Sequence, residues 1–258
     1  MGRKRYLFFD IDGTLLAGGY ENSYIPLSTK EALCRLRDQG HFLAIATGRS
    51  HAMAKETMHA LGFENMVSDG GHGITVENRL LGIKPLRKEE VLTLLRECDE
   101  QKLPWSLQLD DSDTRVTPDE RFPDAIHDDY MKTVVTPDLR PEETEIIYKV
   151  YVACQSPQEQ ALASLSSLPW CRYQKDCLFV EPACKGEGIK AMMDYFHADY
   201  RDVIVFGDSK NDLSMFLDEW TNVAMGNASP ELKAKADLIT SDVDKDGIYH
   251  ACAALGLF

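Results

Sequence analysis

Three unbroken runs of apolar residues limit the possible folds of this chain more than any other feature. Tyr6–Phe9, Phe42–Ala46 and Val203–Phe206 show no alternation of apolar and polar side chains, which is typical of strands buried on both faces. Helical patterns separate them, one opening at Ser28 with capping-box spacing and another after Lys185. This order predicts an α/β fold: a doubly wound, Rossmann-like parallel sheet with helices on both faces.

The middle of the chain has a different character. Its apolar patterns predict helices and strands that pair in an antiparallel manner, and these are Lys88–Gln101, Trp105–Leu109, Tyr148–Ala153, Pro157–Leu168, Trp170–Tyr173 and Leu178–Val180. We therefore interpret residues 82–181 as an α+β domain inserted into the core. On this interpretation, residues 1–81 and 182–258 together form the core domain.

Composition excludes several classes of protein. Lys and Arg total 28 against 42 Asp and Glu, a net charge of -14, and such a surface repels nucleic acid. No apolar run approaches the roughly 20 residues of a membrane-spanning helix. The seven cysteines include no C-x-x-C pair, which argues against a disulfide framework or a zinc site and favours the cytoplasm. The sequence does not indicate an oligomeric state.

Carboxylates follow two of the apolar runs directly. Asp10 and Asp12, in the sequence DIDGT, follow the first run, and Asp208 and Asp212, in GDSKND, follow the last. The carboxyl ends of parallel strands meet at one edge of the sheet. Neighbouring carboxylates repel one another unless a cation or a proton intervenes. The pattern suits a Mg²⁺ site beside a carboxylate nucleophile and a general acid, although D-x-D-G alone is more typical of a solvated turn.

Two further segments supply groups that suit a phosphate. Thr47 and Gly48 end the second apolar run and offer a hydroxyl and backbone N–H groups. Lys185 follows the inserted domain and supplies a positive charge. Taken singly, residues such as Thr47 and Lys185 are more often structural or at the surface.

In this order, the motifs DIDGT, ATGRS, KGEGIK and GDSKND resemble the four motifs of the haloacid-dehalogenase-like (HAD) hydrolase superfamily. The long insertion before the third motif resembles the Cof-type branch, which carries a large cap of the C2B type. The segment Ala224–Ala228 also resembles that branch, whereas Ser68–His72 departs from its usual Asn-Gly-Ala turn.

The resemblance implies roles for individual residues. Asp10 would attack the substrate phosphorus, and Asp12 would act as general acid and then as general base. The phosphoryl group would be bound by Thr47, Gly48, Lys185 and Asn211. Mg²⁺ would be bound by Asp10, the backbone carbonyl of Asp12, Asp208 and Asp212. The implied activity is a Mg²⁺-dependent phosphatase.

The expected substrate is a small phosphorylated metabolite, because an inserted domain can close over the site and exclude macromolecules. Among phosphate monoesters, a sugar phosphate is the first expectation. Polar cap residues are candidates for contacts with substrate hydroxyls, and these are Asp111, Asp113, Arg115, Tyr173 and Lys175. The glycine-rich stretch Ala17–Tyr20 fits either a flap near the site or a plain surface loop.

Three alternatives stay open at this point. Gly186-x-Gly188-x-x-Ala191 opens a helix, with Asp208 about 20 residues further on, which also fits a nicotinamide-dependent oxidoreductase. A phosphosugar mutase of the phosphomannomutase type would use the same nucleophile. A non-catalytic binding module on this fold is the third alternative.

Overall fold

The computed structural model of the chain describes residues 3–19, 22–127, 130–172 and 174–258. Its internal contacts divide the chain into two compact units. We call the first the core unit and the second the cap unit. The core unit comprises Met1–Arg49, Ala54–Gly82 and Cys184–Phe258, and the cap unit comprises Ser50–Met53 and Ile83–Ala183.

The core unit is built on a mainly parallel sheet. In the described residues its strands follow the order β14-β13-β12-β1-β2-β3-β4-β5. The parallel strands are β1 (Tyr6–Phe9), β2 (Phe42–Ala46), β3 (Asn65–Ser68), β12 (Val203–Gly207), β13 (Thr221–Ala224) and β14 (Leu238–Ile239). Strand β4 (Gly73–Val76) pairs antiparallel with β3 and is followed by β5 (Arg79–Ile83). The three strands predicted from the unbroken apolar runs are confirmed.

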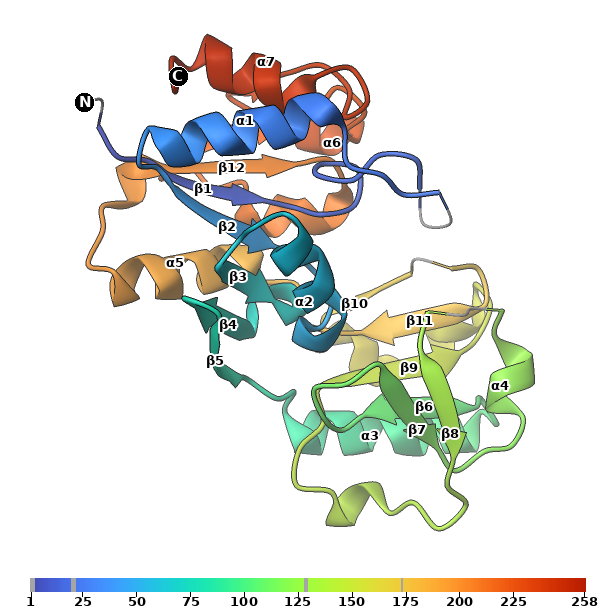
Figure 1. Ribbon diagram of the computed structural model, residues 1–258. Coiled ribbons are helices and arrows are strands. Elements are labelled where there is room, and N and C mark those ends of the chain that lie inside the picture. Colours follow the sequence, from blue (N-terminus) through green and yellow to red (C-terminus); the bar gives the residue numbers. More distant parts are fainter. Residues whose placement is uncertain (1–2, 20–21, 128–129, 173) are drawn as a thin grey trace. The chain divides into compact units, whose positions relative to one another are not determined.

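Helices cover both faces of this sheet. They are α1 (Leu27–Asp38), α2 (His51–Ala60), α5 (Lys185–Tyr195), α6 (Pro230–Lys233) and α7 (Gly247–Ala254). In Figure 1, α1 and α7 lie above β1 and β12, and α5 lies below them. The strands between the two layers are buried, as Leu7, Phe8 and Phe9 of β1 show with no exposed surface. The doubly wound α/β class is therefore confirmed.

The start of α1 differs from the capping-box prediction at Ser28. The helix begins one residue earlier, at Leu27, because the Pro26 carbonyl already accepts a hydrogen bond from Lys30 N at 3.2 Å. The Ser28 hydroxyl is buried and has no hydrogen-bond partner among the described residues. Proline sets the backbone angle at this position, and that constraint outweighs the capping pattern.

The cap unit has its own sheet. Within the described residues the strand order is β10-β11-β9-β6-β7-β8, antiparallel except where β7 pairs with β8. The strands are β6 (Trp105–Gln108), β7 (Thr114–Thr117), β8 (Lys132–Val135), β9 (Lys149–Ala153), β10 (Trp170–Cys171) and β11 (Cys177–Val180). The helices are α3 (Lys88–Glu100) and α4 (Phe122–Ala125).

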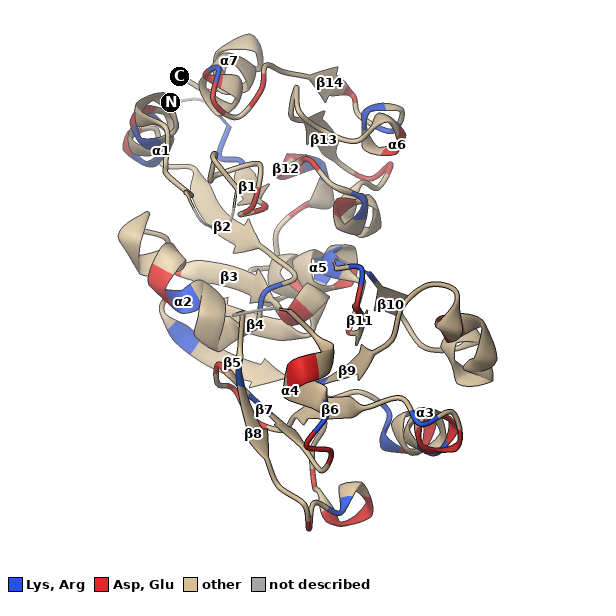
Figure 2. Cartoon of the chain, turned by 90° about the vertical axis from the view of Figure 1, so that its right-hand side faces the viewer, with Lys and Arg blue, Asp and Glu red and all other residues tan. Residues whose placement is uncertain are grey.

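The two faces of the cap sheet differ in chemistry. Leu107, Val150 and Val180 belong to an apolar cluster with Val91 and Leu94 of α3. The opposite face carries buried polar side chains, which include Ser106, Gln108, Arg115, Lys149 and Glu181. Charged residues of both signs lie along α3 in Figure 2. The cap sheet therefore packs one apolar face on its helix and buries polar groups on the other.

The helix predicted at Pro157–Leu168 is wrong. The structure has two short 3₁₀ turns there, Gln158–Ala161 and Ala163–Ser166, separated by Leu162 with a non-helical backbone. Serine side chains compete for the backbone groups that a helix would use, since Ser166 Oγ donates to Ala163 O at 2.8 Å. The predictions at Tyr20 and Tyr173 lie outside the described residues.

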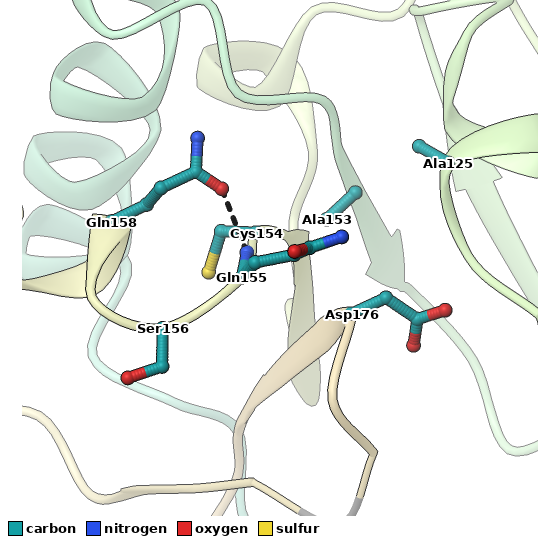
Figure 3. A pocket seen from close by; sticks show the side chains of 7 residues that line it. All are labelled: Ala125, Ala153, Cys154, Gln155, Ser156, Gln158 and Asp176. Atoms are coloured by element: carbon teal, nitrogen blue, oxygen red, sulfur yellow. Dashed lines mark hydrogen bonds between the residues drawn. The ribbon is translucent and has the colours of Figure 1, made fainter.

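The cap unit also contains an open pocket of about 500 Å³ (Figure 3), which is lined by Ala125, Ala153, Cys154, Gln155, Ser156, Gln158 and Asp176. Gln155 N donates to the Gln158 side-chain oxygen at 2.7 Å at its edge. None of the catalytic, phosphate or metal residues predicted from the sequence lines this pocket.

Candidate active site

Two loops at one edge of the core sheet bring the predicted carboxylates together. Strands β1 and β12 are parallel neighbours, with Phe9 paired to Phe206, so Asp10 and Asp208 leave the sheet at the same edge. Figure 2 shows acidic segments directly after both strands. Gly13 has a φ of +80°, and a Cβ atom there would lie 2.2 Å from Asp208 Oδ2. Glycine therefore allows the two loops to touch.

A buried cluster of three carboxylates results. Ligand atoms of Asp10, Asp208 and Asp212 all lie within 4.8 Å of one another. Asp10 is 4% exposed and Asp212 is fully buried. Asp212 Oδ2 accepts hydrogen bonds from the backbone N–H groups of Asp208 and Ser209, at 2.9 and 3.0 Å. The short 3₁₀ turn that carries Asp212 is thus tied back onto the loop that carries Asp208.

Lys185 is the cation of this cluster. It is the first residue of α5, it is 1% exposed, and its Nζ donates to Asp10 Oδ1 at 2.7 Å and to Asp212 Oδ1 at 2.6 Å. Burial alone would lower the pKa of this ammonium, but the two carboxylates outweigh that effect and raise its pKa. Lys185 therefore stays charged.

One ammonium does not neutralise three carboxylates. Burial, together with the charge of Asp212, raises the pKa of Asp10 well above its ordinary value in spite of Lys185. The same two causes raise the pKa of Asp208 to about 7. These shifts mark a site that lacks positive charge. Its ligands are all oxygen atoms, the type that Mg²⁺ prefers, so the residues present fit this ion.

Asp12 lies apart from the carboxylate cluster. Its side chain is 56% exposed, and both of its oxygens accept from Arg49, from Nε at 2.9 Å and from Nη2 at 2.6 Å. The fork of the guanidinium orients the Asp12 carboxylate. Sequence reasoning did not assign a role to Arg49, and the only signal was its position in the ATGRS motif.

The predicted phosphate residues occupy neighbouring turns. Thr47 follows β2, which pairs with β1. The residue is 1% exposed, and its hydroxyl accepts from Arg49 N at 3.1 Å. Gly48 separates these two residues in the same turn. Asn211 belongs to the 3₁₀ turn of Asp212, and its side-chain oxygen accepts from Ser209 Oγ. These residues stay candidates for binding a phosphoryl group.

The glycines of the dinucleotide-like pattern have a packing role. A Cβ atom on Gly186 would lie 2.4 Å from Ser214 O, and one on Gly188 would lie 2.8 Å from Gly71 O. They let α5 approach two backbone segments and so place Lys185 against the carboxylates. The pattern Gly186-x-Gly188-x-x-Ala191 therefore needs no dinucleotide to explain it.

The candidates for hydroxyl binding on the cap differ in environment. Arg115 is 1% exposed, donates to Thr133 Oγ1 at 2.9 Å and stacks over the rings of Phe122 and Tyr151. Asp111 accepts from Ala52 N at 2.7 Å. Arg115 thus has a packing role inside the cap unit.

The family model for haloacid dehalogenase-like hydrolases matches residues 7–252. The chain therefore belongs to this family, and its Cof-type membership and its phosphatase class are confirmed by the relatives that follow. In the described part of the chain, no helix has both the length and the apolar character that crossing a membrane requires.

The chain is 35% identical to "Putative phosphatase YkrA" of Bacillus subtilis, and the match covers 98% of each protein. It is 25% identical to the pyridoxal phosphate phosphatase YbhA of Escherichia coli, over 95% of this chain and 96% of YbhA. Among solved structures, the HAD subclass IIB sugar phosphatase BT4131 matches with a TM-score of 0.78 and 26% identity, over 99% of this chain and 100% of that one.

Proposed function

We propose that the protein is a Mg²⁺-dependent phosphatase that hydrolyses small phosphate monoesters through a phosphorylated Asp10. The observation that carries this proposal is the buried cluster in which Lys185 contacts Asp10 and Asp212 while Asp208 lies within 4.8 Å. Asp10, Asp208, Asp212 and the Asp12 carbonyl would hold Mg²⁺. The ion would neutralise charge on the phosphoryl group and align it for in-line attack.

In the proposed first step, an Asp10 oxygen forms a bond to phosphorus as the bond from phosphorus to the leaving oxygen breaks. Asp12 donates the proton that the leaving alcohol needs. Lys185, Thr47, Gly48 and Asn211 would hold the phosphoryl oxygens. Both Asp12 oxygens accept from Arg49, and each keeps a second lone pair that can carry the proton.

In the second step, Asp12 takes a proton from a water molecule, and the water oxygen attacks phosphorus. The bond from phosphorus to Asp10 breaks, inorganic phosphate leaves and the Asp10 carboxylate is restored. Atoms and charge balance over the two steps, and the net reaction consumes one water. The mutase alternative is not favoured, because YkrA, YbhA and BT4131 all carry phosphatase names.

A sugar phosphate is the substrate class that we propose. The name of the related sugar phosphatase BT4131 supports this class.

Pyridoxal phosphate is a second candidate, supported by the likeness to YbhA. We also propose a cytoplasmic location, since all seven cysteines are free thiols.

The test compares kcat/KM for hexose and pentose phosphates, nucleotides, pyridoxal phosphate and a phosphopeptide, each with Mg²⁺. Asp10→Asn serves as the control for contaminating phosphatases. A preference for sugar phosphates supports the proposal, and a preference for pyridoxal phosphate corrects the substrate alone. If no phosphate monoester is hydrolysed above the Asp10→Asn background, the proposed function is wrong.

A further inference from the structure

The side-chain amide of Asn227 joins three segments that are distant in the sequence. Its Nδ2 donates to Gly13 O at 2.8 Å in the loop after β1 and approaches Asp208 Oδ2 at 3.5 Å in the loop after β12. Its Oδ1 accepts from Val243 N at 2.8 Å. No role was assigned to Asn227 from the sequence, which only placed it in the Ala224–Ala228 segment.

These contacts determine how the amide is oriented. A backbone N–H can only donate, so the oxygen of Asn227 has to face Val243. The amide nitrogen then faces two acceptors, Gly13 O and the Asp208 carboxylate. The backbone of the same segment adds a further contact, because Ser229 N donates to Asp208 O at 2.8 Å. Asn227 therefore belongs to a short segment that holds both loops of the candidate site.

The strengths of these contacts indicate what the amide holds. The short hydrogen bond goes to Gly13 O, whereas the side-chain contacts to Asp208 are long, at 3.5 Å from Asn227 and 3.4 Å from Thr14 Oγ1. Long contacts restrain the Asp208 carboxylate weakly, so its oxygens stay available to a metal ion. The peptide that precedes Gly13 carries the Asp12 carbonyl, which is one of the proposed Mg²⁺ ligands.

We propose that Asn227 is a positioning residue. It holds the Gly13 carbonyl, next to the peptide that carries the Asp12 carbonyl, beside Asp208 at the separation needed for metal binding. The inference rests on the proposed function, since it concerns the metal site of that reaction. It predicts a specific effect. Without the amide, the loop after β1 gains freedom, and a metal ion has to order it again when it binds, which weakens binding.

The variant Asn227→Ala tests this, with Asn65→Ala as the matched control. Asn65 makes a similar pair of contacts, donating from Nδ2 to Leu43 O at 3.4 Å and accepting from Glu77 N at 3.1 Å. It is the first residue of β3, at the amino end of a parallel strand and so at the sheet edge away from the carboxylates. Asn227 is exposed, so its replacement is expected to leave the fold intact.

The readout is the binding of Mn²⁺ alone to the substrate-free full chain, followed by electron paramagnetic resonance. Mn²⁺ shares the preference of Mg²⁺ for oxygen ligands. The melting temperature in EDTA is measured in parallel. For Asn227→Ala we expect the Mn²⁺ Kd to rise about five- to tenfold, the effect of one hydrogen bond, with little change in melting temperature. For Asn65→Ala we expect a lower melting temperature with an unchanged Kd.

An unchanged Kd in Asn227→Ala overturns the inference, and so does an equal rise in both variants. Asn227→Ala could also bind Mn²⁺ more weakly and lose more melting temperature than Asn65→Ala does. That result counts against the inference, because the weaker binding would then follow from a general loss of stability. A different result contradicts the proposed function: wild-type protein that binds Mn²⁺ but hydrolyses no phosphate monoester. A retained Kd in Asn227→Ala alongside an active wild type removes only this inference.

Discussion

Replacing Lys185 with methionine tests the charge balance of the candidate site most directly. Lys185→Met keeps most of the apolar stem and removes the ammonium that contacts Asp10 and Asp212, which are 4% and 0% exposed. In metal-free protein, removing one partner of a buried ion pair costs about 3–5 kcal/mol. The cost is expected to shrink at low pH, because a protonated carboxyl group needs no counter-ion.

This loss translates into a measurable shift. In a unit of this size, 1 kcal/mol corresponds to about 2–4 °C in melting temperature. The core unit of Lys185→Met should therefore melt about 6–20 °C below the wild type in EDTA. Mg²⁺ should restore a large part of the difference, because it supplies positive charge to the same carboxylates. Phosphatase activity should stay very low, since the phosphoryl group loses its ammonium.

The control is a buried ion pair outside the carboxylate cluster. Lys149 Nζ contacts Glu181 Oε2 at 2.6 Å, and their side chains are 4% and 8% exposed. Lys149→Met should cost a similar free energy of unfolding, but Mg²⁺ should not restore it. Calorimetry separates the transitions of the two units if they unfold independently. Equal melting temperatures of wild type and Lys185→Met in EDTA, or equal rescue of both variants by Mg²⁺, would refute the reasoning.

Three further predictions concern the same cluster. Asp10→Asn should abolish phosphate release and keep the fold, because an amide is not a nucleophile; near-native turnover would contradict the mechanism. EDTA should remove activity, Mg²⁺ should restore it, and Ca²⁺ should support it poorly because its looser coordination misaligns the reacting atoms; full activity in excess EDTA would exclude a metal requirement. Gly13→Ala should lower kcat/KM at least tenfold. The new Cβ would lie 2.2 Å from Asp208 Oδ2, and the backbone conformation at this position costs alanine about 1–2 kcal/mol. Wild-type kinetics in this variant would show that the contact between the two loops is unimportant.

Sequence patterns predicted the strands whose side chains are apolar and buried on both faces. Strands β1, β2 and β12 are apolar on both faces, so their patterns are unambiguous. Strand β7 (Thr114–Thr117) was missed because its buried positions are Arg115 and Thr117, which look like loop residues. Arg115 is buried because Thr133, Phe122 and Tyr151 surround it. Those partners come from tertiary packing.

The candidate site was likewise predictable only where local sequence patterns determine it. Asp10 and Asp208 were predictable because each directly follows an apolar strand. The contact of Arg49 with Asp12 and that of Asn227 with Gly13 join residues that are 37 and 214 positions apart. Neither contact leaves a periodic or spacing signal, because each depends on the paths that two loops take after leaving the sheet. Patterns therefore locate the edge of the sheet that carries the candidate site, whereas contacts between its loops require the folded chain.

The pH dependence of stability is a further consequence of the carboxylate cluster. Burial and the charge of Asp212 raise the pKa of Asp208 from 3.8 to about 7. Between these two values the folded, metal-free protein binds a proton that the unfolded chain lacks. By linkage, the free energy of unfolding that Asp208 contributes should fall as pH rises from about 4 to about 7. Asp10, whose pKa is also raised, should act in the same direction.

Mg²⁺ should reverse this trend, because the ion and the proton compete for the same carboxylates. Its stabilising effect should be small at pH 5.5 and should grow up to about pH 8, when Asp208 is ionised. The measurement is the melting temperature of wild type and Asp208→Asn across this range, in EDTA and in Mg²⁺. Asp208→Asn should show a weaker dependence on pH and a smaller shift with Mg²⁺. If Mg²⁺ stabilises the wild type equally at pH 5.5 and pH 8, protons do not compete with the ion, and the carboxylate cluster is not where it binds.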